Sequence, residues 1–218
     1  KNIKKYDFVF ATGVDTVDFV KEKFSCRKLY FIQGYENWAV SEEYLHSTYG
    51  MGFTNIAVAN WLKLVVEAHS QKPCYVIKNP VDVGFYKIQK PLEQRRPYTV
   101  AALYHTTPGK GFSYLMEALL RLKEKYPDFQ AEIFGIPPRP EEFPEWICYT
   151  QSATAEETVA IYNRVPVFLC ASVEEGFGLT GLEAMACGAA LVSTAYQGVL
   201  EYADKTTAML CPIKDVEA

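Results

Sequence analysis

Short, continuous apolar runs alternate with amphipathic segments along the whole chain, and this alternation restricts the possible folds more than any other feature of the sequence. A parallel β-sheet covered by helices produces it, because its strands are buried on both faces and successive strands need a helical connection. Ten runs are predicted to be strands: residues 7–11, 28–33, 55–59, 74–77, 98–103, 129–134, 147–150, 166–171, 189–194 and 207–211. The predicted fold class is therefore α/β.

Helix signals occupy several of the intervening segments. Thr154 and Glu157 have the spacing of a capping box, which predicts a helix from there to about Arg164. Residues 112–126 carry leucines at helical spacing and stop before a proline, and a further helix is expected to open at Asn60. These helices lie between predicted strands, as a βα repeat requires.

A polar, proline-containing stretch near residue 90 separates two groups of predicted strands. We expect residues 1–90 and 91–218 to form two domains. Four strands are few for a complete first domain, and the second group ends soon after a strand, so the sequence predicts an incomplete first domain and a second that lacks its closing helix.

Composition narrows the class of protein. The 218 residues are 49% hydrophobic and 22% charged, which is typical of a soluble globular protein. The net charge of −4 provides no general attraction for nucleic acid. The six cysteines form no CxxC pair, and no run of apolar residues is long enough to span a membrane. These features predict reduced thiols and a cytoplasmic location.

The charge is unevenly divided. Residues 1–90 carry 12 basic and 9 acidic groups, whereas residues 91–218 carry 10 and 17. The basic surplus of the first part is compatible with peripheral contact with the inner face of a membrane, although a surplus this small is common on any solvated surface.

The densest cluster of candidate functional residues follows the strand predicted at 166–171. Glu175 precedes a glycine-rich turn, and a helix is predicted directly after it. Glycines allow a ligand to approach the backbone, and the amides of Leu179 and Thr180 are donors at a helix N-terminus. Such a turn beyond the carboxyl end of a parallel strand suits a phosphate group.

The same turn contains the spacing Gly176-x-Gly178-x-x-Gly181 of a dinucleotide-binding fingerprint. That fingerprint requires an acidic residue at the end of the next strand, where this chain has Ser193 and Thr194. An NAD-dependent oxidoreductase is therefore the weaker interpretation.

Glu175 and Glu183, separated by seven residues and followed by Ala-Met-Ala-Cys-Gly, resemble the signature of retaining nucleotide-sugar glycosyltransferases of the GT-B fold, family 4, also called glycosyl transferases group 1. The Lys110-Gly111 pair, residues 155–172 and the Asn-Pro-Val-Asp turn at 79–82 are also similar to that family. The resemblance covers most of residues 55–215. It implies two Rossmann-like domains, the first on the acceptor side and the second binding the donor.

The resemblance also implies roles for individual residues. Glu175 would contact the hydroxyls of the donor sugar, Lys110 would neutralise the diphosphate, and Glu183 would hold the nucleotide ribose. Glu175 and Lys110 are thus the catalytic candidates. The implied donor-binding residues are His105, Gly176, Phe177, Gly178, Leu179, Thr180 and Glu183.

Two positions depart from the family pattern. His105 stands where relatives usually have an arginine, and Gly34 follows a predicted strand where many relatives have a histidine. Gln33 and Glu36 are the nearby polar residues that would replace that histidine. Structural interpretations also remain: Thr180 and Glu183 have the spacing of a capping box, and Lys110 lies in a loop where a solvated lysine is common.

The function expected from these features is transfer of a hexosyl group, with retention, from a nucleoside diphosphate sugar to a saccharide or lipid-linked acceptor, in polysaccharide or glycoconjugate synthesis. No metal or other cofactor is expected, because the sequence has no Asp-x-Asp, His-Glu-x-x-His or zinc-type cysteine spacing. A nucleotide-sugar epimerase of the same fold and a non-catalytic donor-binding fragment remain alternatives.

Overall fold

The computed structural model describes residues 6–217, which form two compact units divided between residues 79 and 80. The division thus falls earlier than the boundary predicted at residue 90. Residues 80–97 contain little regular secondary structure. They nevertheless belong to the second unit, because they make long-range contacts with it.

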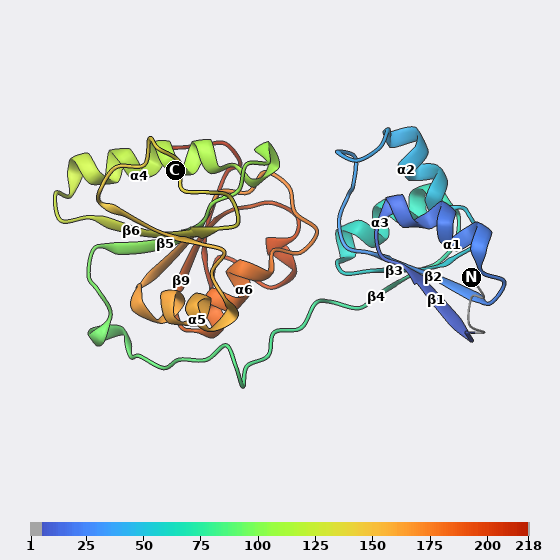
Figure 1. Ribbon diagram of the computed structural model, residues 1–218, viewed down its shortest axis with the longest axis horizontal. Coiled ribbons are helices and arrows are strands. Elements are labelled where there is room, and N and C mark those ends of the chain that lie inside the picture. The colour runs from blue at the N-terminus through green and yellow to red at the C-terminus, as the bar shows by residue number, and fades with distance from the viewer. Residues whose placement is uncertain (1–5, 218) are drawn as a thin grey trace. The chain divides into compact units, whose positions relative to one another are not determined.

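Unit 1 is a parallel four-stranded sheet in the order β1-β2-β3-β4, with three helices on one face (Figure 1). Its elements are β1 (Phe8–Ala11), α1 (Val17–Lys23), β2 (Arg27–Ile32), α2 (Glu42–Tyr49), β3 (Thr54–Ala57), α3 (Asn60–Ser70) and β4 (Cys74–Val76). All four predicted strands and the helix expected at Asn60 are confirmed, whereas α1 and α2 were not predicted.

The two faces of this sheet differ in burial. On the helix-covered face, Tyr30 and Ile32 of β2 are fully or almost fully buried, and the Tyr30 ring lies 6.2 Å from that of Tyr49 of α2. On the other face, Phe10 of β1 and Tyr75 of β4 remain more than half exposed. Among the described residues, no helix of unit 1 lies over this second face (Figure 1).

Unit 2 contains a parallel six-stranded sheet in the order β10-β9-β8-β5-β6-β7. Its elements are β5 (Thr99–Leu103), α4 (Phe112–Lys125), β6 (Gln130–Gly135), β7 (Ile147–Gln151), α5 (Ala155–Arg164), β8 (Val167–Cys170), α6 (Leu179–Ala186), β9 (Ala190–Thr194) and β10 (Met209–Cys211). The six predicted strands and the predicted helices are confirmed. The capping box of α5 is also confirmed, with the Thr154 hydroxyl and the Glu157 carboxylate each accepting a backbone N–H.

Helices cover both faces of this sheet: α4 lies on one side, and α5 and α6 lie on the other (Figure 1). The α4 side packs around Leu119 and Ile133, and the α5 and α6 side packs around Tyr162, Phe168 and Leu191. This three-layer arrangement brings the loops that follow the parallel strands to one edge of the sheet.

Two buried polar side chains fasten the segment before β5 to unit 2. Asn163 of α5 accepts the N–H groups of Gln89 and Lys90 at 2.7 and 3.2 Å and donates to the Lys87 carbonyl. Arg95 donates to backbone carbonyls at the ends of α5 and α6. These contacts explain why the unit begins well before its first strand.

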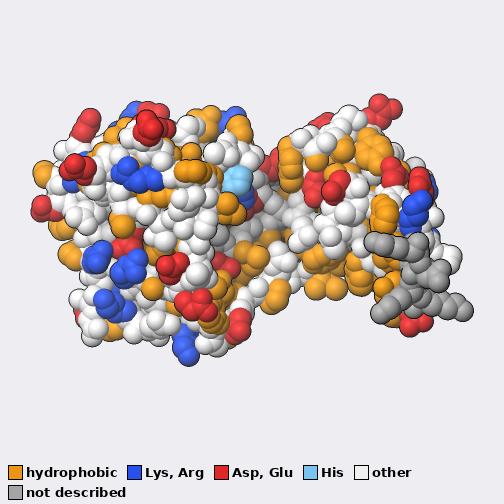
Figure 2. All heavy atoms as spheres, viewed as in Figure 1, with side chains coloured by type: hydrophobic (Ala, Val, Ile, Leu, Met, Phe, Trp, Pro, Cys, Tyr) orange, Lys and Arg blue, Asp and Glu red, His pale blue; other side chains and the backbone are white. Residues whose placement is uncertain are grey.

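The surface shows no dominance of one sign of charge on the face seen in Figure 2, where acidic and basic side chains of unit 2 are interspersed. Over residues 6–217, no helix is both long enough and apolar enough to cross a membrane.

Candidate functional site

The sheet of unit 2 has a switch point between β5 and β8. The chain leaves β5 for β6 and β7 on one side, and later returns to place β8 on the other side. At such a point the loops after the two strands diverge, and open α/β sheets bind ligands in the resulting crevice. Here those loops contain residues 104–111 and 171–178.

The two loops are fastened closely together. The N–H groups of Val173 and Glu174 donate to the Gly109 carbonyl at 2.8 and 3.3 Å. Gly111 has a φ of +63°, and a Cβ at this position would lie 1.9 Å from the carbonyl oxygen of Ala171. Gly111 therefore permits both the backbone turn into α4 and the close approach of the second loop.

Each loop contributes one charged residue to a shared ion pair. The Lys110 ammonium lies 3.0 Å from Glu175 Oε2, and the Glu175 side chain is only 11% exposed. The other carboxylate oxygen, Oε1, accepts the Ser172 hydroxyl at 2.5 Å. Lys110, Ser172, Glu175 and Thr180 line one small recess at the switch point. The structure thus brings together the two residues predicted to be catalytic.

Helix α6 begins beside this pair. Its N-cap, Gly178, has a φ of +89°, and a Cβ there would lie 1.9 Å from the Tyr196 hydroxyl, so glycine is required on two grounds. Leu179 and Thr180 occupy the first turn, where backbone N–H groups have no intrahelical acceptor. These donors and the helix dipole favour an anion at this position.

Buried aromatic side chains support the glycine-rich turn from the interior of unit 2. The Tyr202 hydroxyl donates to the Gly178 carbonyl at 2.8 Å and lies 3.4 Å from the Tyr196 hydroxyl. The Phe177 ring is buried, with its centroid 5.5 Å from that of Tyr202. Phe177 therefore supports the turn from inside the fold.

Glu183 lies one turn further along α6 and does not close the helix. The N-cap is Gly178 and no side chain caps the helix, so the alternative of a capping box between Thr180 and Glu183 is wrong. Glu183 instead accepts the hydroxyl of the buried Tyr162 at 3.3 Å and interacts with the hydroxyl of Tyr86. Burial raises the pKa of the Glu183 carboxyl, and the two phenols oppose that rise.

His105 is placed differently from the other candidates. It lies in the loop after β5, and its Nδ1 accepts the N–H of Thr107 at 3.0 Å. It is absent from the residues that line the recess around Lys110 and Glu175. Its predicted role in binding the donor stays a prediction, supported only by its position in the same loop as Lys110.

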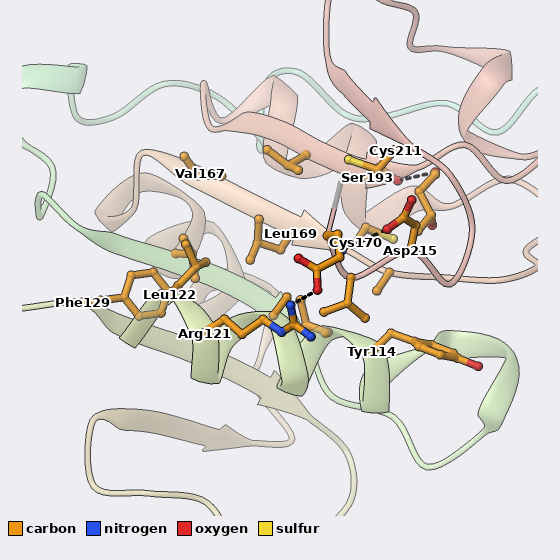
Figure 3. A pocket seen from close by; sticks show the side chains of 18 of the residues that line it. Tyr114, Arg121, Leu122, Phe129, Val167, Leu169, Cys170, Ser193, Cys211 and Asp215 are labelled. Atoms are coloured by element: carbon orange, nitrogen blue, oxygen red, sulfur yellow. Dashed lines mark hydrogen bonds and ion pairs between the residues drawn. The ribbon is translucent and has the colours of Figure 1, made fainter. Parts of the chain in front are cut away.

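A larger groove of about 720 Å³ lies between α4 and strands β5, β8 and β9 of unit 2 (Figure 3). Val167 and Leu169 of β8 and Leu122 of α4 line it. Arg121 of α4 reaches across it to Glu217. The groove is mostly apolar and contains neither Lys110 nor Glu175, whereas the recess at the switch point contains both, so we place the functional site at the switch point.

Unit 1 shows where the two predicted substitutes for the family's histidine lie. Gln33 donates to the Thr12 carbonyl at 3.0 Å. Glu36 accepts the Val14 N–H at 2.7 Å and the Tyr30 hydroxyl at 3.5 Å. Both side chains form hydrogen bonds within unit 1, and these bonds indicate no functional role for either residue.

Within residues 6–217, no three His, Cys, Asp or Glu side chains are grouped so that they could hold a metal ion. At the switch point, the ammonium of Lys110 and the backbone amides at the start of α6 are groups that can act on a phosphate.

Comparison with known proteins agrees with this geometry. The family model described as glycosyl transferases group 1 matches residues 95–218, which is more than half of the chain and includes the whole site. The chain therefore belongs to the glycosyl transferases group 1 family.

A serotype-specific mannosyltransferase, WbdA from Escherichia coli, is 29% identical over 122 residues, covering 56% of this chain and 13% of WbdA. The chain thus spans about an eighth of that relative's length. Among solved structures, HepE from Anabaena, in complex with UDP and glucose, superimposes with a TM-score of 0.80 at 15% identity over 97% of this chain and 66% of HepE. Sucrose-phosphate synthase from Thermosynechococcus elongatus gives 0.79 at 15% identity, over 98% and 62%. The predicted GT-B type of fold is confirmed.

Sequence reasoning missed the partners of the charged residues. Ser172, Tyr162 and Tyr202 hold Glu175, Glu183 and the glycine-rich turn. Ser172 lies only three residues before Glu175. The two tyrosines are more than twenty residues from the groups that they contact, so no spacing rule indicates them.

Proposed function

We propose that unit 2 binds a nucleoside diphosphate sugar at the switch point, and that the protein to which it belongs transfers the hexosyl group to a hydroxyl of a saccharide or lipid-linked acceptor, with retention. The observation that carries this proposal is the Lys110–Glu175 pair, 3.0 Å apart, beside the N-terminus of α6. A cation and free amides suit the diphosphate, and a carboxylate suits the hydroxyls of the sugar. The UDP and glucose in the structure of HepE support the same class of ligand.

The proposed step exchanges one bond at the anomeric carbon. The bond from that carbon to the diphosphate oxygen breaks, and a bond to the acceptor oxygen forms on the same face. The leaving diphosphate takes the acceptor's proton, while Lys110 and the first amides of α6 stabilise the negative charge that develops on it. Glu175 orients the sugar, and Glu183 holds the ribose.

Binding is the first measurement. UDP, GDP, dTDP and ADP, each with and without a hexose, are compared by the shift in unfolding temperature that they cause. We expect at least one nucleotide and its sugar conjugate to stabilise the chain. NADH is included because stabilisation by NADH alone would support an oxidoreductase and contradict the proposal.

Turnover is the second measurement. Glu175→Gln is expected to lower the transfer rate about a hundredfold while leaving the affinity for the free nucleotide nearly unchanged, because the lost charge acts on the sugar. Glu174→Gln, which removes the adjacent carboxylate, is the matched control. Equal turnover in the Glu175 variant and the parent would remove Glu175 from the reaction. Tight nucleotide binding without any transfer would identify the chain as a donor-binding part only.

A further inference from the structure

The carboxylate of Glu175 has its two oxygens engaged by different groups. Oε1 accepts the Ser172 hydroxyl at 2.5 Å, and Oε2 faces the Lys110 ammonium at 3.0 Å. A carboxylate rotates freely about its last torsion unless each oxygen is bound, so these two contacts select one orientation of the group.

The direction of the Ser172 hydrogen bond is determined by its neighbours. An ionised carboxylate can only accept, so the hydroxyl must donate to Glu175. The lone pairs of the hydroxyl oxygen face Cys170, whose thiol donates to it at 3.5 Å. The serine is 2% exposed. Water therefore does not compete readily for this hydroxyl.

The backbone of Ser172 is itself fixed to the sheet. The Thr194 hydroxyl, at the end of β9, donates to the Ser172 carbonyl at 2.5 Å. The next residue, Val173, donates its N–H to the Gly109 carbonyl. Contacts thus lead to this segment from the end of β9 and from the loop after β5, and from the serine to the carboxylate.

We infer that Ser172 is a positioning residue for the transfer reaction: it holds Oε1 of Glu175, so that only Oε2 is presented to Lys110 and to the donor sugar. This inference rests on the proposed function. When the diphosphate draws the ammonium toward itself, Oε2 becomes available to a sugar hydroxyl while Oε1 stays fixed. Ser172 therefore acts on the sugar part of the donor and not on the nucleotide.

A graded series of variants tests this assignment. Ser172→Ala removes the donor, and Ser172→Cys replaces it with a weak one of similar size. We expect the transfer rate to fall about 10- to 100-fold for alanine and less for cysteine, since the lost bond is to a charged group. The affinities for UDP and GDP should stay within about twofold, because the serine acts on the sugar part of the donor. Unchanged turnover in Ser172→Ala would overturn the inference.

Ser193→Ala is the matched control. Ser193 is also 2% exposed, lies on the neighbouring strand β9, and donates its hydroxyl to a backbone carbonyl, at 2.9 Å. If the two alanine variants unfold at the same temperature but only Ser172→Ala loses turnover, a general loss of structure is excluded. An equal loss of turnover in both would assign Ser172 a merely structural role.

A double-mutant cycle with Glu175→Gln shows whether Ser172 acts through Glu175. Removing the hydroxyl in that background should cause little further loss of turnover, whereas a full additional loss would contradict the inference. UDP-glucose and GDP-mannose are the probes. If neither they nor the free nucleotides bind the unsubstituted chain, the proposed function fails and this inference fails with it. If they bind and Ser172→Ala behaves as the parent, this inference alone fails.

Discussion

At the scale of single residues, Glu36 in unit 1 is a carboxyl on which burial and hydrogen bonding have opposite effects. Glu36 is a half-buried carboxyl that accepts the Val14 N–H at 2.7 Å. Burial raises the pKa of Glu36, the nearby Asp15 carboxylate adds to the rise, and hydrogen bonds from Val14 and Tyr30 oppose it. A carboxyl whose ionised form is disfavoured in the folded state makes stability depend on pH.

The sign of that dependence follows from the order in which the two states ionise. Below about pH 4, the ordinary carboxyl range, Glu36 is protonated in both folded and unfolded chains. As the pH rises through the ordinary pKa toward the raised one, the unfolded chain loses its proton first. The free energy of unfolding of unit 1 therefore falls over this window, and Glu36→Gln should remove the fall.

Urea unfolding at a series of pH values, from about 4 to 8, measures this effect. Trp38 and Trp61 lie in unit 1 and Trp146 in unit 2, so fluorescence in a Trp146→Phe background reports unit 1 alone. The variant should gain stability relative to the parent as the pH rises. Glu22→Gln on α1 controls for the loss of one surface charge. A constant difference between Glu36→Gln and the parent would contradict the prediction.

At the scale of elements, the start of α6 shows how a helix terminus is held without a capping side chain. No side chain caps Gly178, and the Tyr202 hydroxyl donates to the carbonyl of that glycine. The Tyr202 hydroxyl also packs against Gly181, because a Cβ at that position would lie only 2.5 Å from the Tyr202 oxygen. The tyrosine thus sets the direction in which the helix leaves the glycine-rich turn.

Tyr202→Phe is expected to destabilise unit 2 by about 1–2 kcal/mol, because a mostly buried carbonyl loses its donor while the ring packing is kept. Urea unfolding followed by Trp146 fluorescence, in a background with Trp38→Phe and Trp61→Phe, measures the change. Tyr126→Phe, at a phenol that is 39% exposed at the end of α4, is the control. Equal stabilities of the two variants would show that the Tyr202 hydrogen bond does not support the turn.

Elements and site residues were predictable to different degrees. The ten strands follow from short apolar runs, because burial leaves a local record in the sequence even in unit 1, where helices cover only one face of the sheet. Lys110 and Glu175 were predictable as one site because each follows a strand at the switch point. Helices α1 and α2 were missed. The partners Tyr162 and Tyr202 were missed because hydrogen bonds between distant residues leave no periodicity.

At the scale of the whole molecule, the boundary between the units also depends on contacts between residues that are distant in sequence. The polar, proline-containing stretch near residue 90 predicts a linker between the two units. Phe85 and Tyr86 nevertheless pack against the core formed by α5 and α6, and Asn163 binds three backbone groups of the segment. The segment is part of unit 2 because of contacts made across more than seventy residues of sequence.

Arg95 makes several of these contacts, all of them to backbone carbonyls. It is 6% exposed, and its guanidinium donates to the carbonyls of Lys90, Tyr162, Val165 and Cys187. Three of these carbonyls lie at the ends of α5 and α6, where the helix dipoles are negative, so the buried charge is stabilised there without a carboxylate.

Arg95→Met keeps much of the side-chain volume but leaves these carbonyls without their donor. We expect it to destabilise unit 2 by about 3 kcal/mol or more, with no change in unit 1. The two tryptophan backgrounds described above measure the units separately in one urea titration series. Arg139→Met is the control, because Arg139 also donates to two backbone carbonyls but is exposed, and it should cost less than about 1 kcal/mol. A unit-1 signal that shifts as far as the Trp146 signal would show that the chain unfolds as one cooperative body, and would contradict the division of its stability into two units.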